Sequence, residues 1–223
     1  ANGNITGAGT LTLNAADGVT VNNDLTTVGT LTISADTDGG DNDGLLDVNA
    51  AISSTNTTIA ITTDNIDLTG GNLDSGSAAT TITDSDGTGI GLGDTAINNG
   101  LHLSDAELGN ISATGLNITT AGSITADNIT AANTANITGN LILNSDASVS
   151  FSNNSSNITN SLIVDAHNGI TVDQNITSVS GAVSLDGDSN NNADGTDNIA
   201  FGNVTVTSSN GITLNASNGD ITS

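Results

Sequence analysis

The chain of 223 residues contains no Lys, Arg, Cys, Pro, Met, Trp or Tyr, and its 24 acidic residues give it a formal net charge of −24. Nucleic-acid binding depends on Lys and Arg side chains that neutralise phosphates, so that function is excluded. Attachment to an anionic membrane surface is disfavoured for the same reason. No apolar run approaches the roughly 20 residues that a membrane-spanning helix needs, so we expect no membrane insertion.

Aromatic side chains are almost missing, since Phe151 and Phe201 are the only two. A globule of this size normally uses aromatic residues and Met in its core as well as aliphatic ones. This core must be built from Val, Ile, Leu and Ala, which indicates a narrow interior. High negative charge with few aromatics also fits disorder. Against disorder, the chain has no Pro, a single Glu (Glu107) and many Ile, Val, Leu and Thr residues, which favour half-buried strands.

Missing residues also bear on origin and location. The chain begins without an initiator Met and shows no signal peptide, which indicates a processed or excised segment. Cys is absent, so disulfides are impossible, and the sequence leaves the redox compartment open. A chain without Lys or Arg offers no cleavage site to trypsin-like proteases, which suits an extracellular location.

Short apolar-x-apolar pairs recur along the chain, as in Leu11/Leu13 and Leu101/Leu103. Such alternation is typical of a strand with one buried face. Turn signals such as Asp17-Gly18 and Asn210-Gly211 separate the pairs. The segment 104–108 is the only one that we expect to form a helical turn.

Three sets of apolar positions recur with a common period of about 21 residues, which is typical of a repeat architecture. The first set is Leu141/Leu143, Leu162/Val164, Val183/Leu185 and Val204/Val206. The second is Val149/Phe151, Ile170/Val172 and, two periods on, Ile212/Leu214. The third is Leu116, Ile137, Ile158, Val179 and Ala200. Near the N-terminus the step is slightly shorter, from Leu11/Leu13 to Leu31/Ile33.

These columns predict an all-β fold, a right-handed parallel β-helix with three short strands and about 20 to 22 residues in each coil. Coils stack at about 4.8 Å, so the chain would form about ten coils and a rod of roughly 50 Å. A sandwich or barrel also has many short strands, but it does not require apolar columns at a constant step. We treat residues 1–223 as one continuous segment of tandem coils.

A longer repeat is also visible, because residues 11–44 match residues 162–195 at a spacing of 151 residues, or about seven coils. If Ser223 were joined to Ala1, Leu11/Leu13 would follow Ile212/Leu214 by one ordinary coil step. The chain is therefore expected to continue into an equivalent segment. That segment would follow covalently in a longer repetitive chain or head to tail in a homopolymer.

The wording of the repeats resembles the filamentous haemagglutinin-like β-helical exoproteins of bacteria, which are giant surface or secreted proteins of the adhesin type. The resemblance rests on TLTLNAADGVTV (10–21), GITLNASNGDIT (211–222) and TGIGLGDTAINNGLHLSDAELGNISATGLNIT (88–119), and it covers nearly the whole chain. These motifs are of low complexity, so they specify architecture better than biological role. The resemblance implies a fibrous rod, on the cell surface or released, used in adhesion or cell-envelope structure.

Acidic loops are the candidate ligand sites. The first loop carries Asp36, Asp38, Asp41, Asp43 and Asp47, and its counterpart carries Asp186, Asp188, Asp194 and Asp197 together with Asn190 and Asn192. A shorter one has Asp84 and Asp86, with Asp94 nearby. Several carboxylates among Gly and small polar residues can turn oxygens toward one Ca²⁺ ion. None has the EF-hand spacing, and the alternative is a solvated loop that protrudes between coils.

Catalysis is not expected. His102 lies between two inward Leu residues and His167 lies in a turn, so both should face solvent. Carbohydrate-active β-helices use paired carboxylates, but their sites also need aromatic platforms and basic groups. This chain has two aromatic residues and no basic ones.

Ice binding is a further alternative, because threonines recur at the coil spacing near the N-terminus. These are Thr10/Thr12 and Thr30/Thr32. The expected outward positions further along are Ile142, Ile163, Ser184 and Thr205, which do not continue the column.

The sequence as a whole predicts an extracellular or cell-surface structural rod that forms filaments by self-association and has no catalytic activity. The alternative is the stalk of a bacterial adhesin, which presents a binding region elsewhere in a larger chain. Any cell-surface or carbohydrate target is left unspecified. A charge of −24 also predicts that lateral bundling depends on divalent cations or high salt.

Overall fold

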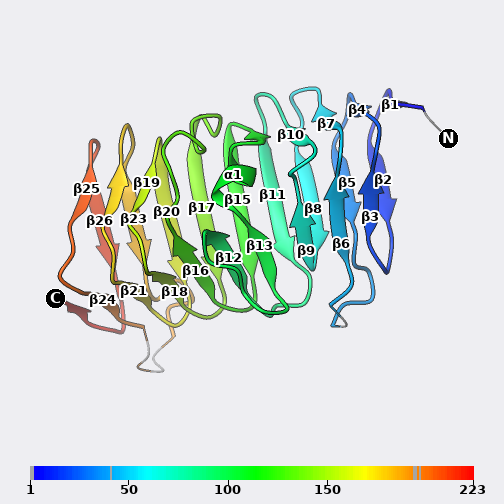
Figure 1. The fold of residues 1–223 in the computed structure, drawn as a ribbon. Helices are drawn as coiled ribbons and strands as arrows, with labels where there is room; N and C mark the ends of the chain where they lie inside the picture. The colour runs from blue at the N-terminus through cyan, green and yellow to red at the C-terminus, as the bar shows by residue number, and fades with distance from the viewer. Residues whose placement is uncertain (1–2, 41, 193–194, 196) are drawn as a thin grey trace.

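The structure is a computed structural model that describes residues 3–40, 42–192, 195 and 197–223. The described residues form 27 β-strands and one short helix, and strands of successive coils pair in parallel. Figure 1 shows an elongated stack of coils with the two termini at opposite ends. The chain is a parallel β-helix, which confirms the predicted fold class.

The first wall of the helix is a sheet of nine strands whose order follows the chain. Its strands are β2 (Leu11–Asn14), β5 (Leu31–Ser34), β8 (Ile59–Thr63), β11 (Ala79–Asp84), β15 (Gly115–Thr120), β17 (Asn140–Ser145), β20 (Ser161–Ala166), β23 (Val183–Asp186) and β26 (Ile212–Asn215). One strand per coil gives nine coils, where the period predicted about ten.

The second wall follows the first in every coil and consists of a three-stranded and a seven-stranded sheet. The three-stranded sheet holds β3 (Val19–Val21), β6 (Leu45–Val48) and β9 (Asn65–Asp67). The seven-stranded sheet holds β13 (Leu101–Leu103), β12 (Ile90–Gly93), β16 (Ile124–Asp127), β18 (Val149–Phe151), β21 (Ile170–Val172), β24 (Ile199–Phe201) and β27 (Ile221–Thr222). The backbone N–H of His102 donates to Asn65 Oδ1 at 2.9 Å, which links the two sheets.

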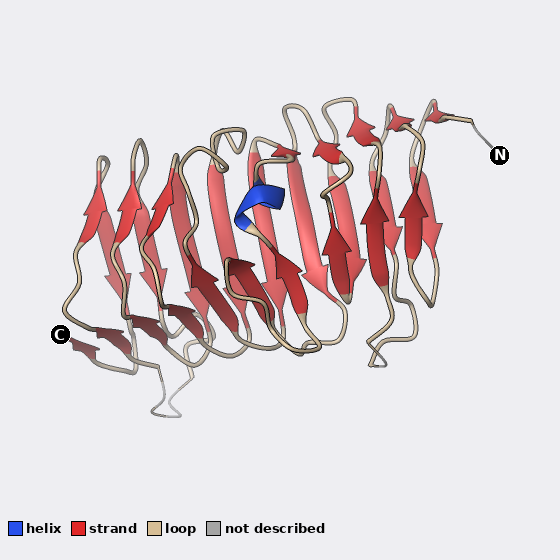
Figure 2. Ribbon diagram, viewed as in Figure 1, coloured by secondary structure: helices blue, strands red, loops and turns tan. Residues whose placement is uncertain are grey.

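The third wall completes each coil and also consists of two sheets. One holds β1 (Ile5–Gly7), β4 (Leu25–Thr27), β7 (Ala51–Ser54), β10 (Asn72–Asp74) and β14 (Ile111–Ser112), and the other holds β19 (Ser156–Ile158), β22 (Ile176–Ser178) and β25 (Val206–Ser208). A single parallel bridge between Ala113 and Ile137 lies between them along the chain. Figure 2 shows this wall as short strands joined by long turns.

Coil length varies more than the sequence period indicated. Four of the eight steps along the nine-stranded sheet keep the predicted length, such as the step from Leu141 to Leu162. The other four are longer, and the two longest run from Thr80 to Leu116 and from Val183 to Ile212. The longer coils carry loops at their corners, which consume chain without adding strands to this sheet. For this reason the 151-residue repeat spans six coil steps along the sheet, from β2 to β20, where we expected about seven coils.

Near the C-terminus, loops also move residues out of the columns that the sequence period predicted. The pairings of β17 with β20 and of β20 with β23 confirm the first column up to Val183/Leu185. Its last member is wrong, because β23 pairs with Ile212/Leu214 of β26 and not with Val204/Val206. The last member of the second column is also wrong, because β27 and not Ile212/Leu214 lies two coils after β21. The segment 187–198 adds residues between these strands and moves all later positions.

The third predicted column is wrong. Leu116 belongs to the nine-stranded sheet, where it pairs with Leu141. Ile137 pairs with Ala113 at the isolated bridge, and Ile158 pairs with Ser178. Val179 is 52% exposed. The shared period thus grouped residues of different walls.

The outward face of the nine-stranded sheet changes character along the rod. Thr12, Thr32 and Thr81 are aligned with Ala60, and the column continues through Asn117, Ile142, Ile163 and Ser184 to Thr213. The last outward position is therefore Thr213 and not Thr205. The column contains threonines but is not a regular threonine array.

The second wall contains a strand that the period did not predict. Strand β13 pairs with β12, which precedes it in the chain, and lies on the side toward β9. The connecting loop folds back over β12, so a Cβ at Gly91 would lie 2.0 Å from the carbonyl oxygen of Thr95. Only glycine fits at this position.

The core is a continuous stack of aliphatic side chains, with Phe151 as its one buried aromatic residue among those described. Parallel sheets usually have both faces covered. Here one face is exposed, so inward residues such as Leu141, Leu143 and Ser145 alternate with half-exposed or exposed ones. This explains why the strands alternate in sequence.

Buried hydroxyl groups close the corners after the strands. Thr27 Oγ1 donates to the carbonyl of Gly29 at 2.8 Å, Ser75 Oγ to that of Ala78 at 2.9 Å and Ser178 Oγ to that of Asn160 at 2.7 Å. Each hydroxyl thus donates a hydrogen bond to a turn carbonyl beside the core.

The expected helical turn is present as α1 (Asp105–Leu108), with Ser104 as N-cap. Ser104 and Glu107 form a capping box. The turns predicted at Gly18 and Gly211 have positive φ angles, as expected. Within the described ranges no helix has the length and apolar character to cross a membrane.

Candidate functional site

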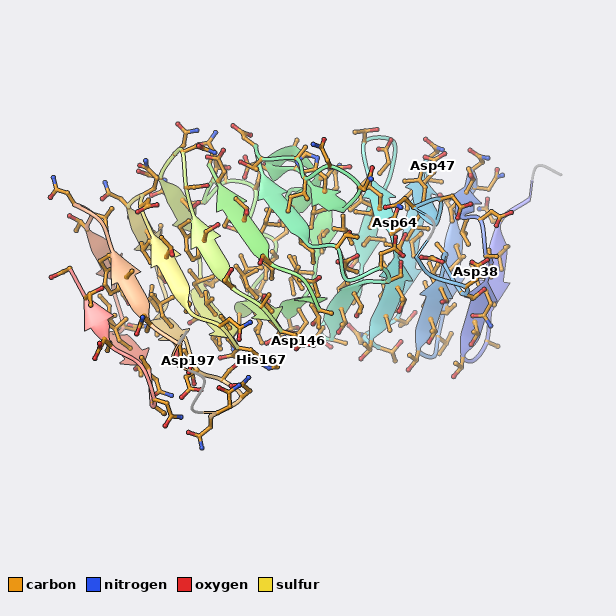
Figure 3. The ribbon with its side chains drawn as sticks, turned by 90° about the horizontal axis from the view of Figure 1, so that it is seen from below. Asp38, Asp47, Asp64, Asp146, His167 and Asp197 are labelled. Atoms are coloured by element: carbon orange, nitrogen blue, oxygen red, sulfur yellow. The ribbon has the colours of Figure 1, made fainter. Side chains whose placement is uncertain are left out.

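In the described part of the first acidic loop, Asp38 lies within hydrogen-bonding distance of Asp36, whereas Asp47 points elsewhere. Asp36 is buried, Asp38 and Asp43 are exposed, and Asp41 lies outside the described residues. Asp47 is on the outward face of β6, where it accepts a hydrogen bond from Asn49 Nδ2 at 2.9 Å. Figure 3 shows Asp38 and Asp47 apart from each other near the N-terminal end of the rod.

The carboxylate of Asp36 holds the loop backbone in place. Asp36 Oδ1 accepts a hydrogen bond from the N–H of Gly39 at 2.7 Å, and Oδ2 accepts one from Ser85 Oγ at 2.6 Å. Asp86 Oδ1 accepts a hydrogen bond from the N–H of Gly40, also at 2.7 Å. Burial alone would raise the pKa of Asp36, but the hydrogen bonds from Ser85 and Gly39 outweigh it and lower this pKa. Asp36 is therefore charged in the folded chain.

Three neighbouring coils bring four carboxylates together, and we call Asp36, Asp64, Asp84 and Asp86 the acidic corner. Asp36 follows β5, Asp64 follows β8, and Asp84 ends β11 with Asp86 just beyond it. All four lie where the nine-stranded sheet turns toward the second wall. Because Ser34 pairs with Thr62, Asp36 and Asp64 occupy equivalent positions of adjacent coils.

Asp64 is the most constrained member of the acidic corner. It is 7% exposed, and no donor of the described residues reaches its Oδ1 atom. Its carboxyl group lies within hydrogen-bonding distance of that of Asp86. Burial, followed by the negative charges of Asp86, Asp84 and Asp36, raises the pKa of Asp64 to about 6. Figure 3 shows Asp64 further along the rod toward the C-terminus than Asp38 and Asp47.

Two further oxygens of the acidic corner resemble Asp64 Oδ1. Asp84 Oδ1 and Asp86 Oδ2 are buried and have no hydrogen-bond donor in the described part of the chain. The other oxygen of Asp84 is satisfied by Thr120 Oγ1 at 2.6 Å and by the N–H of Gly89 at 3.0 Å. The acidic corner therefore has three buried carboxylate oxygens without a donor.

Sequence reasoning named Asp36, Asp84 and Asp86 but missed Asp64. The predicted acidic loops are contiguous stretches of the sequence, whereas Asp64 stands alone between Thr63 and Asn65. The strand register is the signal that would have identified it, because the register places residues of adjacent coils side by side.

The counterpart loop has a similar beginning. Asp186 lies on the outward face of β23 and accepts hydrogen bonds from Asn215 Nδ2 at 2.8 Å and from the N–H of Asp188 at 3.1 Å. Asp188 is 2% exposed, and its Oδ2 accepts hydrogen bonds from the N–H and the side chain of Asn218. Asp197 is fully buried, and Asp194 lies outside the described residues. Asp188 and Asp197 thus turn inward, whereas Asp186 does not.

Asp94 does not join Asp84 and Asp86, because Asn128 Nδ2 donates to its Oδ2 at 2.6 Å. No group of three or more Asp, Glu, His or Cys side chains in the described ranges is arranged as a ready metal-binding group.

The structure describes one polar side-chain contact for each of the two histidines. The Nε2 atom of His102 lies 3.0 Å from the carbonyl oxygen of Gly93, on the outward face of β13. His167 Nδ1 lies 3.5 Å from Asp146 Oδ1, and both side chains reach solvent. Figure 3 shows this pair at the same edge of the rod as Asp197.

The N-terminal coil is open at its end. A hollow there is lined by apolar Leu13, Val19, Val21 and Leu25 together with polar residues such as Asn22.

Comparisons with protein-family models, with curated proteins and with solved structures found no match. The class of protein is thus defined by its fold, a parallel β-helix with an acidic corner.

Proposed function

We propose that this chain is an extracellular, non-catalytic structural rod that assembles into filaments through its end coils. The observation that carries the proposal is the unbroken parallel stack of nine coils, whose terminal strands β2 and β26 each have one unpaired edge within the described chain. Such edges pair readily with another strand of the same kind.

The two end coils match on all three walls. The last coil presents β25, β26 and β27, and the first presents β1, β2 and β3 in the same wall order. Counted through a head-to-tail junction, β25 precedes β1 and β26 precedes β2 by one coil step of about 21 residues. Strand β27 precedes β3 by the same step. One stacking therefore places three strands beside three strands at an ordinary coil step.

Apolar surface at both ends supports the same stacking. Ile5, Ile212 and Ile221 are 50%, 45% and 51% exposed. Stacking a second copy would cover these side chains and continue the aliphatic core across the junction. Burying apolar surface stabilises such contacts by roughly 25 cal/mol per Å².

The experiment uses the free edge of β26. The N–H of Val183 donates to Gly211 and that of Gly187 to Asn215, so the odd-numbered residues of β26 face β23. Ile212 then directs its N–H to the free edge. We expect the wild-type chain to form uniform fibres in electron micrographs, whereas Ile212→Pro should stay short because it removes an edge donor.

Ile212→Val is the matched control, since it keeps both the donor and an apolar side chain. Circular dichroism should show the same β content for all three proteins. If Ile212→Pro elongated as well as the wild type, or if the wild type stayed monomeric at high concentration, end-to-end assembly would be rejected.

The adhesin-stalk alternative uses the same matching ends, because a covalent continuation would stack in the same way. We favour it only if purified rods carry a non-repetitive domain. Cryo-EM of native material, traced through the junction of two such segments, separates the two proposals.

A further inference from the structure

The acidic corner brings four carboxyl groups together without a cationic side chain to neutralise them. Asp64 is covered by the loop of Asp36 on one side and by Asp84 and Asp86 on the other, so every titratable group near it is a carboxyl group. The chain contains no Lys or Arg. A buried carboxylate without a partner is costly, and neighbouring like charges increase the cost.

The unpaired oxygens locate the missing partner. Asp64 Oδ1, Asp84 Oδ1 and Asp86 Oδ2 are buried without a donor in the described part of the chain, whereas the other oxygens of Asp84 and Asp86 accept hydrogen bonds. The described donors that reach Asp84 and Asp86 therefore bind the other oxygen of each carboxylate. A cation would neutralise the three buried oxygens that have no donor.

We propose that the acidic corner binds a Ca²⁺ ion, with Asp64 and Asp86 as its primary ligands and Asp84 beside them. Ca²⁺ is a hard cation that takes six to eight oxygen ligands in flexible geometry. The described carboxylates do not form a complete group by themselves. Backbone carbonyls and water therefore complete the shell, as is common for this ion.

This site differs from the calcium loop that the sequence suggested. Asp47 is on an outward strand face, and the loop of residues 37–40 is held by the N–H groups of Gly39 and Gly40. The ion would instead join the coil of β8 to that of β11. Through Asp86 and Asp36 it would also support the loop after β5. Binding should therefore stabilise three coils together.

The test is calorimetric titration of chelator-treated protein with CaCl₂ at neutral pH. Asp64→Asn and Asp86→Asn each keep the size of the side chain and remove a ligand charge. The matched control is Asp165→Asn, because Asp165 also has a raised pKa, from burial and from the charge of Asp186, but it stands on an outward strand position.

Asp64→Asn and Asp86→Asn should bind one equivalent of Ca²⁺ less than the wild type, or bind it at least tenfold more weakly. Asp165→Asn should bind like the wild type. In thermal unfolding, Ca²⁺ should raise the Tm of the wild type and of Asp165→Asn more than that of the other two variants. Equal binding by all four proteins would overturn the proposal, and so would a wild type that binds no Ca²⁺.

A measurement on the wild type alone covers the case in which a variant fails to fold. In NMR spectra, Ca²⁺ should shift the backbone amide signals of Asp64 and Asp86 and leave that of Asp165 in place. Unchanged signals for Asp64 and Asp86 would mean that the pair shares a proton and binds no metal. Fibre formation is scored separately by microscopy, so failure here does not affect the proposed assembly.

Discussion

The pKa values of two buried aspartates in this chain are shifted in opposite directions by their surroundings. Asp127 accepts hydrogen bonds from Thr95, Asn153 and Asn154, and these outweigh the effect of burial and lower its pKa. Asp64 has carboxylates as neighbours instead, and its pKa is raised. At the scale of single residues, the partner of a buried acid decides whether it is stable as an anion.

The raised pKa of Asp64 predicts a specific pH dependence. The folded chain binds this proton up to about pH 6, whereas the unfolded chain releases it near 3.8. The contribution of Asp64 to stability is therefore full below pH 3.8 and is lost as the pH rises toward 6. In chelator, Asp64→Asn should be more stable than the wild type at pH 7, by up to roughly 3 kcal/mol.

The difference in unfolding free energy between the two proteins, measured by urea denaturation at several pH values, checks this prediction. Asp36, Asp67 and Asp127 have lowered pKa values, so they increase the stability of each protein as the pH rises, opposite to the effect of Asp64. Their contributions largely cancel in the difference. A gap between the proteins that stays constant from pH 3.5 to 7 would contradict the raised pKa.

At the scale of elements, α1 shows how an interruption of the coil is held in place. Glu107, the single Glu of the chain, is 6% exposed. Its Oε2 accepts hydrogen bonds from the N–H and the hydroxyl of Ser104, and its Oε1 accepts one from the N–H of Leu68 at 2.9 Å. One side chain thus caps the helix and ties it to the end of β9.

Glu107→Ala should therefore destabilise the chain by about 2 to 3 kcal/mol, because it leaves the N–H of Leu68 buried without a partner. Glu107→Gln keeps an oxygen acceptor and should cost less. Hydrogen exchange at Leu68 reports the local effect, and thermal unfolding reports the global one. Equal exchange rates for Leu68 in the wild type and in Glu107→Ala would rule out this role.

At the scale of the whole molecule, charge governs how rods meet. Parallel rods of −24 each repel one another along their length, whereas stacking at the ends brings few charges together. We expect single fibres at low salt in chelator and lateral bundles when millimolar Mg²⁺ or Ca²⁺, or high NaCl, is added. Light scattering and electron microscopy check this, and bundles that form equally well in chelator at low salt would refute it.

Much of the architecture was predictable from the sequence. Inward and outward residues alternate because one strand face meets an aliphatic core and the other meets water, so Leu141/Leu143 and Leu162/Val164 identified their strands and their pairing. Gly and Asn at the turns identified the corners. The single helical turn followed from the same local rules, since all of these are properties of neighbouring residues.

What the sequence did not determine is which residues meet across coils. Each corner loop adds chain without adding a strand, so Ile212/Leu214 replaced Val204/Val206 beside β23, and β13 inserted next to β12. The register between coils likewise placed Asp64 beside Asp36, Asp84 and Asp86. Local alternation identified the strands, because burial acts on each strand separately, and the recurring apolar columns indicated that these strands stack as a parallel β-helix. The tertiary structure alone decided the acidic corner, because register sums the lengths of all the loops between two strands.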